Sequence, residues 1–303
     1  MRSQKFVFPR LKYKQAGIIN FVEYKHKRFK LIYLLMLALL VISLFIAIFP
    51  LFYLLIQSFK TPEEINSNLF KFWPEVIDLG KIIDVWQVSG LGVYFTNTII
   101  VLIGSIVSSI IFNGLLAYGV SIVKPKGSQL VYGLILGSYM IPTVLSIIPL
   151  YAMIVNLKLI NSFIPLWFAF GANAFYFINF KNYFDKIPKE LVESMRVDGC
   201  GDFQIFFKLI LPVSKPIIGT IAILATSAAW GDFLLPKLVL MDDSMFTLMV
   251  KLFSINATMG TVAGYTPDML LMALLLSIIP QIFIFLIFQK QITGGSLEGG
   301  VKE

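Results

Sequence analysis

The chain contains six apolar runs, each long enough to cross a lipid bilayer as a helix. An α-helix needs roughly 20 residues to cross the hydrocarbon core, which is about 30 Å thick. The composition agrees, because only 14% of the residues are charged, whereas soluble domains contain about 25%. We therefore predict an all-α integral membrane protein with six transmembrane helices. They lie near residues 31–57, 97–122, 129–153, 162–180, 216–236 and 268–288.

Lysine and arginine are divided unequally between the two sides of such a protein. Of the 25 basic residues, 19 fall in the N-terminal segment, the second and fourth connections and the C-terminal tail, and six fall on the opposite side. Cytoplasmic segments of membrane proteins carry the excess of positive charge, so both termini are predicted to be cytoplasmic. The net charge of +8 then reflects membrane orientation and does not indicate a nucleic-acid-binding surface.

Residues suited to enzyme chemistry are scarce. A single cysteine, Cys200, excludes an internal disulfide and a cysteine-cluster metal site, and with a single histidine, His26, it argues against a Cys–His nucleophile pair. The glycine-rich tail has Val301 where a phosphate-binding loop requires lysine. We therefore predict no catalytic residues, no metal and no nucleotide site in this chain.

A polar segment, residues 183–216, interrupts the apolar pattern on the cytoplasmic side. Pro188 suits the first turn of a helix that ends at Asp198-Gly199, because glycine accepts the positive φ of a helix C-terminus. Asp202 is predicted to cap a second helix, which Pro212 closes. An apolar face of this second helix is formed by Phe203, Phe206, Phe207 and Ile210.

Two roles are open for this helix-glycine-helix segment. Its phenylalanines supply area to bury, and Glu193 and Arg196 offer charges, so it is suited to lie in a groove on a partner protein. The alternative is an amphipathic loop that packs on its own helical bundle.

The segment resembles a known family. Glu193-Ser194-Met195, Asp198-Gly199-Cys200 and Pro212 are spaced as in the "EAA" loop of bacterial ABC importer permeases, with Ser194, Met195 and Cys200 where alanine is usual. Further likeness to the carbohydrate branch, and to the second permease of maltose importers, is found at Asn97-Thr98, residues 141–149, residues 230–233 and the tail at 299–302.

This resemblance implies a type I ABC importer permease fold whose coupling helix docks on a separate ATPase. The implied partners are a second homologous permease, a dimer of ATPase subunits that binds Mg-ATP, an extracytoplasmic solute-binding protein, a carbohydrate substrate and the bilayer of the bacterial cytoplasmic membrane. The implied docking residues are Glu193, Ser194, Met195, Arg196, Asp198, Gly199, Cys200, Phe203, Phe206, Phe207 and Pro212, with Gly299, Gly300, Val301 and Lys302 as a second ATPase contact.

Polar residues within the spans are candidates for the route of the sugar. Polar side chains are costly in lipid and face the interior of a bundle, where amides and aromatic rings suit sugar hydroxyls and C–H faces. Hydrogen bonding between helices is the alternative role for each of them. The candidates are Asn113, Tyr139, Asn173, Trp230, Asp232 and Gln281, with Tyr176 and Asn179.

The domain organisation is predicted to be simple: residues 1–30 form a basic cytoplasmic segment and 31–303 the permease domain. The connections 59–94 and 237–267 are predicted to be extracytoplasmic, where they either receive the binding protein or only cover the bundle. Gly133 and Gly137 permit close helix packing. As alternatives in function we keep an importer of a non-sugar solute such as glycerol phosphate, polyamine or peptide, a membrane enzyme, and a passive channel.

Overall fold

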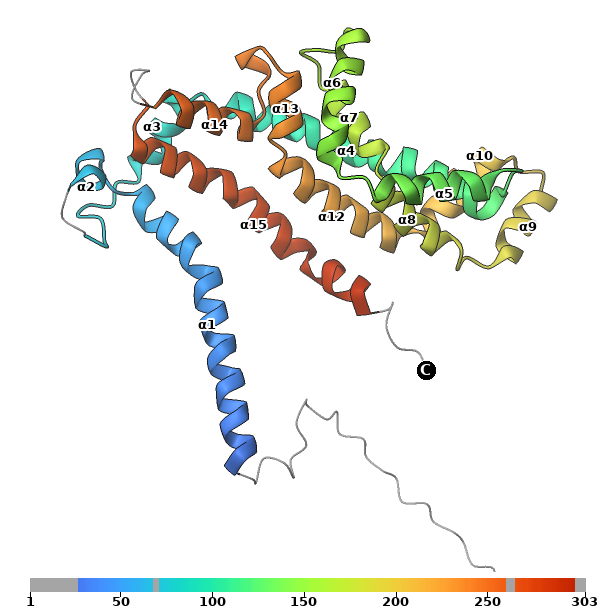
Figure 1. Cartoon of the computed structure of the whole chain (residues 1–303), viewed down its shortest axis with the longest axis horizontal. Coiled ribbons are helices and arrows are strands. Elements are labelled where there is room, and N and C mark those ends of the chain that lie inside the picture. The colour runs from blue at the N-terminus through green and yellow to red at the C-terminus, as the bar shows by residue number, and fades with distance from the viewer. Residues whose placement is uncertain (1–26, 68–70, 260–264, 298–303) are drawn as a thin grey trace, which may run out of the picture. The chain divides into compact units, whose positions relative to one another are not determined.

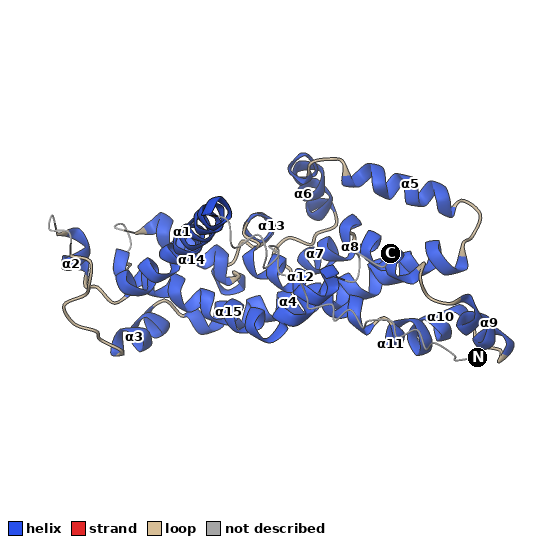
Figure 2. Ribbon diagram, turned by 90° about the horizontal axis from the view of Figure 1, so that it is seen from below, coloured by secondary structure: helices blue, strands red, loops and turns tan. Residues whose placement is uncertain are grey.

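The computed structural model describes residues 27–67, 71–259 and 265–297, and every regular element in those ranges is a helix (Figures 1 and 2). The chain divides after Leu55 into two compact units. The first holds most of α1 (Lys27–Ser58). The second holds α2 (Pro62–Asn66), α3 (Gly80–Val88), α4 (Leu91–Tyr118), η2 (Gly119–Val123), α5 (Ser128–Tyr139), η3 (Thr143–Ser146), α6 (Ile147–Asn156), α7 (Ile164–Gly171), α8 (Ala174–Phe184), α9 (Lys189–Val197), α10 (Asp202–Ile205), η4 (Phe206–Ile210), α11 (Leu211–Val213), α12 (Lys215–Gly231), α13 (Leu234–Val239), η5 (Asp243–Met245), α14 (Leu248–Thr258) and α15 (Pro267–Leu297).

Three straight helical segments are long and apolar enough to cross a membrane: Leu31–Ser58, Leu91–Val123 and Pro267–Gln289. They match the first, second and sixth predicted spans. Two bent pairs also qualify if each pair is one span, namely Ser128–Tyr139 with Thr143–Asn156 and Asp202–Val213 with Lys215–Gly231. The described residues therefore contain three to five candidate spans.

Breaks in the backbone account for the difference from six uninterrupted spans. The third predicted span bends by 102° between α5 and η3, and Pro142 lies at the bend as the N-cap of η3. The fourth is divided into α7 and α8 at Ala172 and Asn173. Proline removes a backbone donor, and in a membrane the freed groups must find partners within the protein.

The break between α7 and α8 is closed by Asn113 of α4. Its Nδ2 donates to the Phe170 carbonyl at 2.9 Å, and its Oδ1 accepts from the Asn173 backbone N–H at 3.1 Å. The Asn173 side chain in turn caps α8 by accepting from the Tyr176 N–H at 3.1 Å. Two asparagines thus satisfy backbone groups that lipid could not.

Helix α4 is the central helix of the second unit and packs closely on α7. A Cβ at Gly104 would lie 2.2 Å from Trp167 Nε1, and a Cβ at Gly171 would lie 2.5 Å from Ser108 Oγ. Glycine at both positions therefore allows the two helices to approach this closely. A Cβ added at Gly133 or Gly137, the predicted close-packing pair, would instead meet no atom of the described residues within 4 Å beyond its own helix backbone.

The described parts of the connections 59–94 and 237–267 contain short helices and meet at one end of the second unit, which we name the α3–α14 cap (Figure 1). Asn97 Nδ2 donates to the carbonyls of Ser244 and Phe246, and Thr98 Oγ1 accepts from the Leu248 N–H at 2.8 Å. Lys81 of α3 lies 3.0 Å from Asp268 of α15, and both side chains are largely buried. This end of the unit is consequently held by hydrogen bonds and an ion pair.

A second ion pair strengthens the cap at Asp243. Lys251 Nζ lies 2.9 Å from Asp243 Oδ1, and the Tyr94 hydroxyl donates to the same carboxylate. Burial alone would raise the pKa of Asp243, but the hydrogen bonds from Tyr94 and Lys251 outweigh it and lower the pKa. Burial would lower the pKa of Lys251, whereas its bonds to Tyr94 and Asp243 raise it. The stabilisation is therefore lost only as pH falls through the depressed Asp243 pKa or rises through the elevated Lys251 pKa, so the pair stays charged at neutral pH.

Candidate functional site

The polar segment 183–216 forms a tight helical elbow, as predicted. Helix α9 ends at the C-cap Asp198, and Gly199 follows with φ of +79°. The Gly199 N–H donates to the Arg196 carbonyl and the Cys200 N–H to the Met195 carbonyl, both at 3.0 Å. This pair of bonds is the Schellman motif, in which the residue of positive φ reverses the chain and satisfies the last carbonyls of the helix. The prediction of positive φ at Gly199 is confirmed.

The two ends of the elbow differ from the prediction. Pro188 is the N-cap of α9 and lies outside the first turn. The N-cap of α10 is Gly201, which has no side chain to accept a hydrogen bond, and Asp202 is the first helical residue. The prediction of Asp202 as the cap was therefore wrong. The reason is that the Schellman turn uses Gly199 and Cys200, so the extended residue before the helix is Gly201.

The Asp202 carboxylate contacts other side chains. Its Oδ1 accepts from the Tyr118 hydroxyl at 3.2 Å and from Arg196 Nη2 at 3.3 Å. Tyr118 is the last residue of α4 and is buried, so the contact ties the elbow to a candidate span. The bridge to Arg196 is half exposed and contributes little by itself, because exposed ion pairs are screened by water.

The predicted apolar face of the second helix is in fact two adjacent rows. Phe206 and Ile210 are fully buried, whereas Phe203 is 72% exposed and Phe207 is 48% exposed. Residues four apart share a row on a helix, so the spacings of three and four in this run combine two faces. The buried row packs with Phe177, Phe180 and Phe184 of α8, and the Phe206 ring also lies against Gly114 of α4.

Substitutions in the two rows are expected to affect the stability of the protein differently. We expect Phe206→Ala to destabilise the protein by about 3–5 kcal/mol, as for other buried phenylalanines. Phe203→Ala should leave stability within about 0.5 kcal/mol, because the side chain is exposed. Thermal unfolding of the purified chain in detergent measures both. Equal losses of stability at the two positions would contradict the assignment of the rows.

The second helix does not end at Pro212. The helical backbone runs from Asp202 through η4 and α11 to Val213, and the break falls at Ser214, where the direction changes by 82° into α12. Pro212 lies in the short element α11, just after η4, and the helical run continues one residue beyond it to Val213. The prediction that Pro212 closes the helix was therefore wrong.

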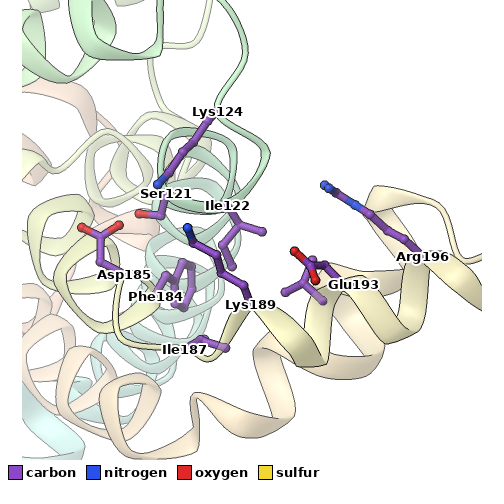
Figure 3. A pocket seen from close by; sticks show the side chains of 10 residues that line it. Ser121, Ile122, Lys124, Phe184, Asp185, Ile187, Lys189, Glu193 and Arg196 are labelled. Carbon is purple, nitrogen blue, oxygen red and sulfur yellow. The ribbon is translucent and has the colours of Figure 1, made fainter.

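A pocket of about 260 Å³ lies between the end of α4–η2, the end of α8 and the side of α9 (Figure 3). Buried apolar side chains form its floor and charged side chains its rim. The lining residues are Ser121, Ile122, Lys124, Phe184, Asp185, Ile187, Lys189, Val192, Glu193 and Arg196.

The predicted sugar-route residues occupy several environments. Trp230 is buried and donates from Nε1 to the Ser277 carbonyl at 3.1 Å, joining α12 to α15. Tyr139 is exposed and stacks on the ring of Phe175, with centroids 6.4 Å apart. Asp232 follows the last residue of α12 as its C-cap, and Gln281 is half-buried in α15.

Several of these polar groups therefore serve helix contacts, as Asn113 and Asn173 do at the break between α7 and α8. Tyr176 is buried, and Asn179 Nδ2 donates to the carbonyl of Phe175 in its own helix. A direct role in the sugar route stays a prediction for each of them. The predicted ATPase contact at Gly299, Gly300, Val301 and Lys302 lies outside the described residues.

Sequence reasoning did not identify Tyr118, Gly104 or Gly171 as important positions. Tyr118 is one tyrosine among 12, and only the fold brings it to Asp202. Gly104 and Gly171 lie on different helices, so no spacing rule within one helix could reveal that both belong to one interface.

Comparison with known proteins identifies the family of this chain. The family described as binding-protein-dependent transport system inner membrane component matches residues 110–293. The arabinooligosaccharides transport system permease protein AraQ of Halalkalibacterium halodurans is 32% identical over 261 residues, covering 85% of this chain and 92% of that protein. The melibiose/raffinose/stachyose import permease protein MelC of Bacillus subtilis is 31% identical, covering 84% of this chain and 91% of that protein.

A solved structure shares the fold. The crystal structure of a bacterial ABC transporter involved in the import of the acidic polysaccharide alginate contains a chain that superposes with a TM-score of 0.78 at 24% sequence identity, covering 88% of this chain and 98% of that chain. The chain therefore belongs to the family of binding-protein-dependent transport system inner membrane components, the permeases of ABC importers.

Proposed function

We propose that this chain is a permease subunit of an ATP-driven, binding-protein-dependent importer of oligosaccharides, and that it forms half of the translocation pathway with a second, homologous permease. The relatives described above are permeases whose names specify arabinooligosaccharides and the melibiose, raffinose and stachyose group. As a member of this family the chain is a multi-pass protein of the bacterial cytoplasmic membrane. It breaks no covalent bond itself.

The proposed topology has six spans with both termini in the cytoplasm. The three straight segments, the bent pair Ser128–Tyr139 with Thr143–Asn156, and α12 supply five spans, and the broken pair α7–α8 supplies the sixth. The excess of lysine and arginine on the side of the polar segment 183–216 supports a cytoplasmic elbow. The α3–α14 cap lies at the other end of the second unit from α9 and α10 (Figures 1 and 2), which fits an extracytoplasmic position.

The elbow is proposed to dock on a dimer of ATPase subunits, which bind Mg-ATP. Its outward surface combines the exposed row Phe203 and Phe207 with Val197, which is 87% exposed. Exposed apolar side chains at a rigid turn, rimmed by charges such as Glu193, suit insertion into a cleft of a partner. The inward row joins the same element to α4 and α8, so movement of the partner would be transmitted to the spans.

The α3–α14 cap is the proposed contact for the solute-binding protein. Its hydrogen bonds and ion pairs give it a fixed shape, and a pre-formed surface binds without the cost of ordering loops. Between the cap and the elbow, the exposed Tyr139–Phe175 stack beside Asn173 is the proposed surface for sugar. Aromatic faces pack against the C–H faces of sugar rings, and nearby amides can bond hydroxyl groups.

The proposal is tested by purifying the complex through a tag on this chain and measuring ATP hydrolysis in the presence of the co-expressed binding protein. We expect oligosaccharides to stimulate hydrolysis, and Tyr139→Ala to reduce the stimulation roughly fivefold to tenfold if stacking contributes about 1–1.5 kcal/mol. Val131→Ala, at another exposed position of α5, is the matched control. Stimulation by glycerol phosphate, polyamine or peptide, and by no oligosaccharide, would reject the sugar assignment in favour of the alternative importer.

A further inference from the structure

The pocket beside α9 has the construction of a binding site for an amphiphilic anion. Phe184 and Val192 on its floor are buried, and the rim carries the cations Lys124, Lys189 and Arg196. Its volume of about 260 Å³ is just below the range of about 300–1,000 Å³ for pockets that enclose drug-sized ligands. The size therefore suits a headgroup or a small anion and is too small for a whole lipid.

Two of the cations are available to a ligand. Figure 3 shows Lys124 and Lys189 directing their ammonium groups toward the same part of the pocket, beside Ser121. Neither ammonium group has an ion-pair partner among the described residues, where the five ion pairs involve Lys71, Lys81, Lys181, Arg196 and Lys251. Two unpaired like charges that converge on one small space repel each other until an anion enters.

The acidic side chains of the rim do not cancel this charge. Asp185 is already paired with Lys181, at a distance of 2.7 Å. Glu193 extends from α9 farther along the rim, on the side of Arg196 (Figure 3). The part of the pocket next to Ser121 thus keeps an excess of positive charge.

The position of the pocket points to its occupant. Lys124 directly follows the candidate span Leu91–Val123, so its ammonium group lies at the level where a span leaves the hydrocarbon. Lysines at the ends of spans reach toward lipid headgroups, and the cytoplasmic leaflet carries anionic lipids. From these observations we propose that the pocket binds the phosphate group of an anionic phospholipid headgroup between Lys124 and Lys189. The inference rests on the proposed cytoplasmic placement of α9.

Such a lipid would stabilise the position of the elbow relative to the span α4–η2. Lys124 belongs to the end of the α4–η2 span and Lys189 is the first residue of α9, so one phosphate held by both would link the span to the docking helix. The chemistry recognised is a phosphate ester, which a free phosphate also offers. The two sources are separated by the experiment that follows.

The test measures retention of phosphatidylglycerol by the delipidated complex in detergent, by native mass spectrometry, with phosphatidylcholine as the neutral comparison. We expect selective retention of phosphatidylglycerol. Lys124→Gln combined with Lys189→Gln should weaken it roughly 30-fold, because each lysine near an anionic headgroup contributes about fivefold in affinity. Lys126→Gln is the matched control, since Lys126 lies in the same exposed connection but does not line the pocket.

A further variant changes the result in the opposite direction. Glu193→Gln removes a negative charge from the rim and should strengthen retention by less than the roughly fivefold effect of a lysine at the phosphate, a direction that general loss of structure could not produce. Equal retention of the two lipids, or unchanged retention in the double lysine variant, would overturn the site. Displacement of the lipid by millimolar inorganic phosphate would support the phosphate chemistry and assign the pocket to a soluble ligand. Because retention is measured without ATP or sugar, a negative result leaves the proposed transport function to be judged by its own test.

Discussion

Replacing Gly199 by valine is expected to abolish transport while leaving the protein in the membrane. Gly199 has φ of +79°, a conformation that costs a residue with a Cβ about 1–2 kcal/mol and a β-branched residue more. No atom lies within 4 Å of the position that a Cβ would occupy, so the effect acts through the backbone alone. The Schellman turn that aligns α9 with α10 would be lost, and the docking surface with it.

The measurement combines three assays of Gly199→Val: its amount in the membrane fraction, oligosaccharide uptake by cells, and sugar-stimulated ATP hydrolysis by the purified complex. Uptake should fall at least about tenfold, since about 2 kcal/mol changes the population of the turn roughly 30-fold. Gly199→Asn should be milder, because asparagine tolerates the left-handed region. Normal uptake by the valine variant at normal expression would contradict the docking role of the elbow.

A matched control lies two residues along the chain. Gly201 also has no neighbour within 4 Å of a built Cβ, but its φ of −74° and ψ of 164° are extended. This conformation suits a β-branched residue. Gly201→Val should therefore retain most of the uptake. If both valine variants lose transport equally, bulk at the elbow matters and the positive φ of Gly199 does not.

The second large effect is expected from Gly104→Ala. The added Cβ would lie 2.2 Å from Trp167 Nε1, much closer than non-bonded atoms can approach, so the Trp167 side chain or the two helices would have to shift. Overpacking of this kind costs about 1–3 kcal/mol or more. We expect a lowered melting temperature of the purified protein in detergent, measured by fluorescence-detected size exclusion after heating.

Gly133→Ala serves as the control for this prediction. Gly133 also lies within a helix, α5, but no atom lies within 4 Å of its built Cβ. Alanine there removes conformational freedom from the unfolded chain and should raise stability by up to about 1 kcal/mol. A melting temperature of Gly104→Ala at or above that of Gly133→Ala would show that α4 and α7 do not approach as the structure describes.

Sequence reasoning reached the membrane class, the position of the helical elbow and its glycine, because each depends on local chemistry. Apolar length identifies a span, and the order of helix formers, Asp198 and Gly199 identifies a helix end. The interruptions at Pro142 and between α7 and α8 were less accessible. Whether a proline bends a span by a few degrees or by 102° depends on which neighbour satisfies the freed backbone groups, and that neighbour is set by tertiary packing.

The division of the apolar face into a buried and an exposed row likewise could not be predicted from the sequence. Phe203 and Phe206 are the same residue type three positions apart, and only the presence of Gly114 and the phenylalanines of α8 on one side decides which is buried. For Asn113 and Trp230 the sequence indicated correctly that a polar group within a span has a specific partner. It could not distinguish a sugar from a backbone carbonyl of another helix.

The bend of 82° at Ser214 has a mechanical consequence if the two arms keep their angle. At 1.5 Å per residue the arm Asp202–Val213 is roughly 18 Å long and α12 roughly 25 Å long. Together they form a lever with two arms at nearly a right angle, and its pivot lies at Ser214. A thrust of about 1 Å on the short arm would tilt α12 by about 3° and sweep its far end sideways by roughly 1.4 Å, following from those lengths. A displacement applied to the short arm is thereby turned through nearly a right angle, and the displacement at the far end of α12 is modestly larger than the one applied.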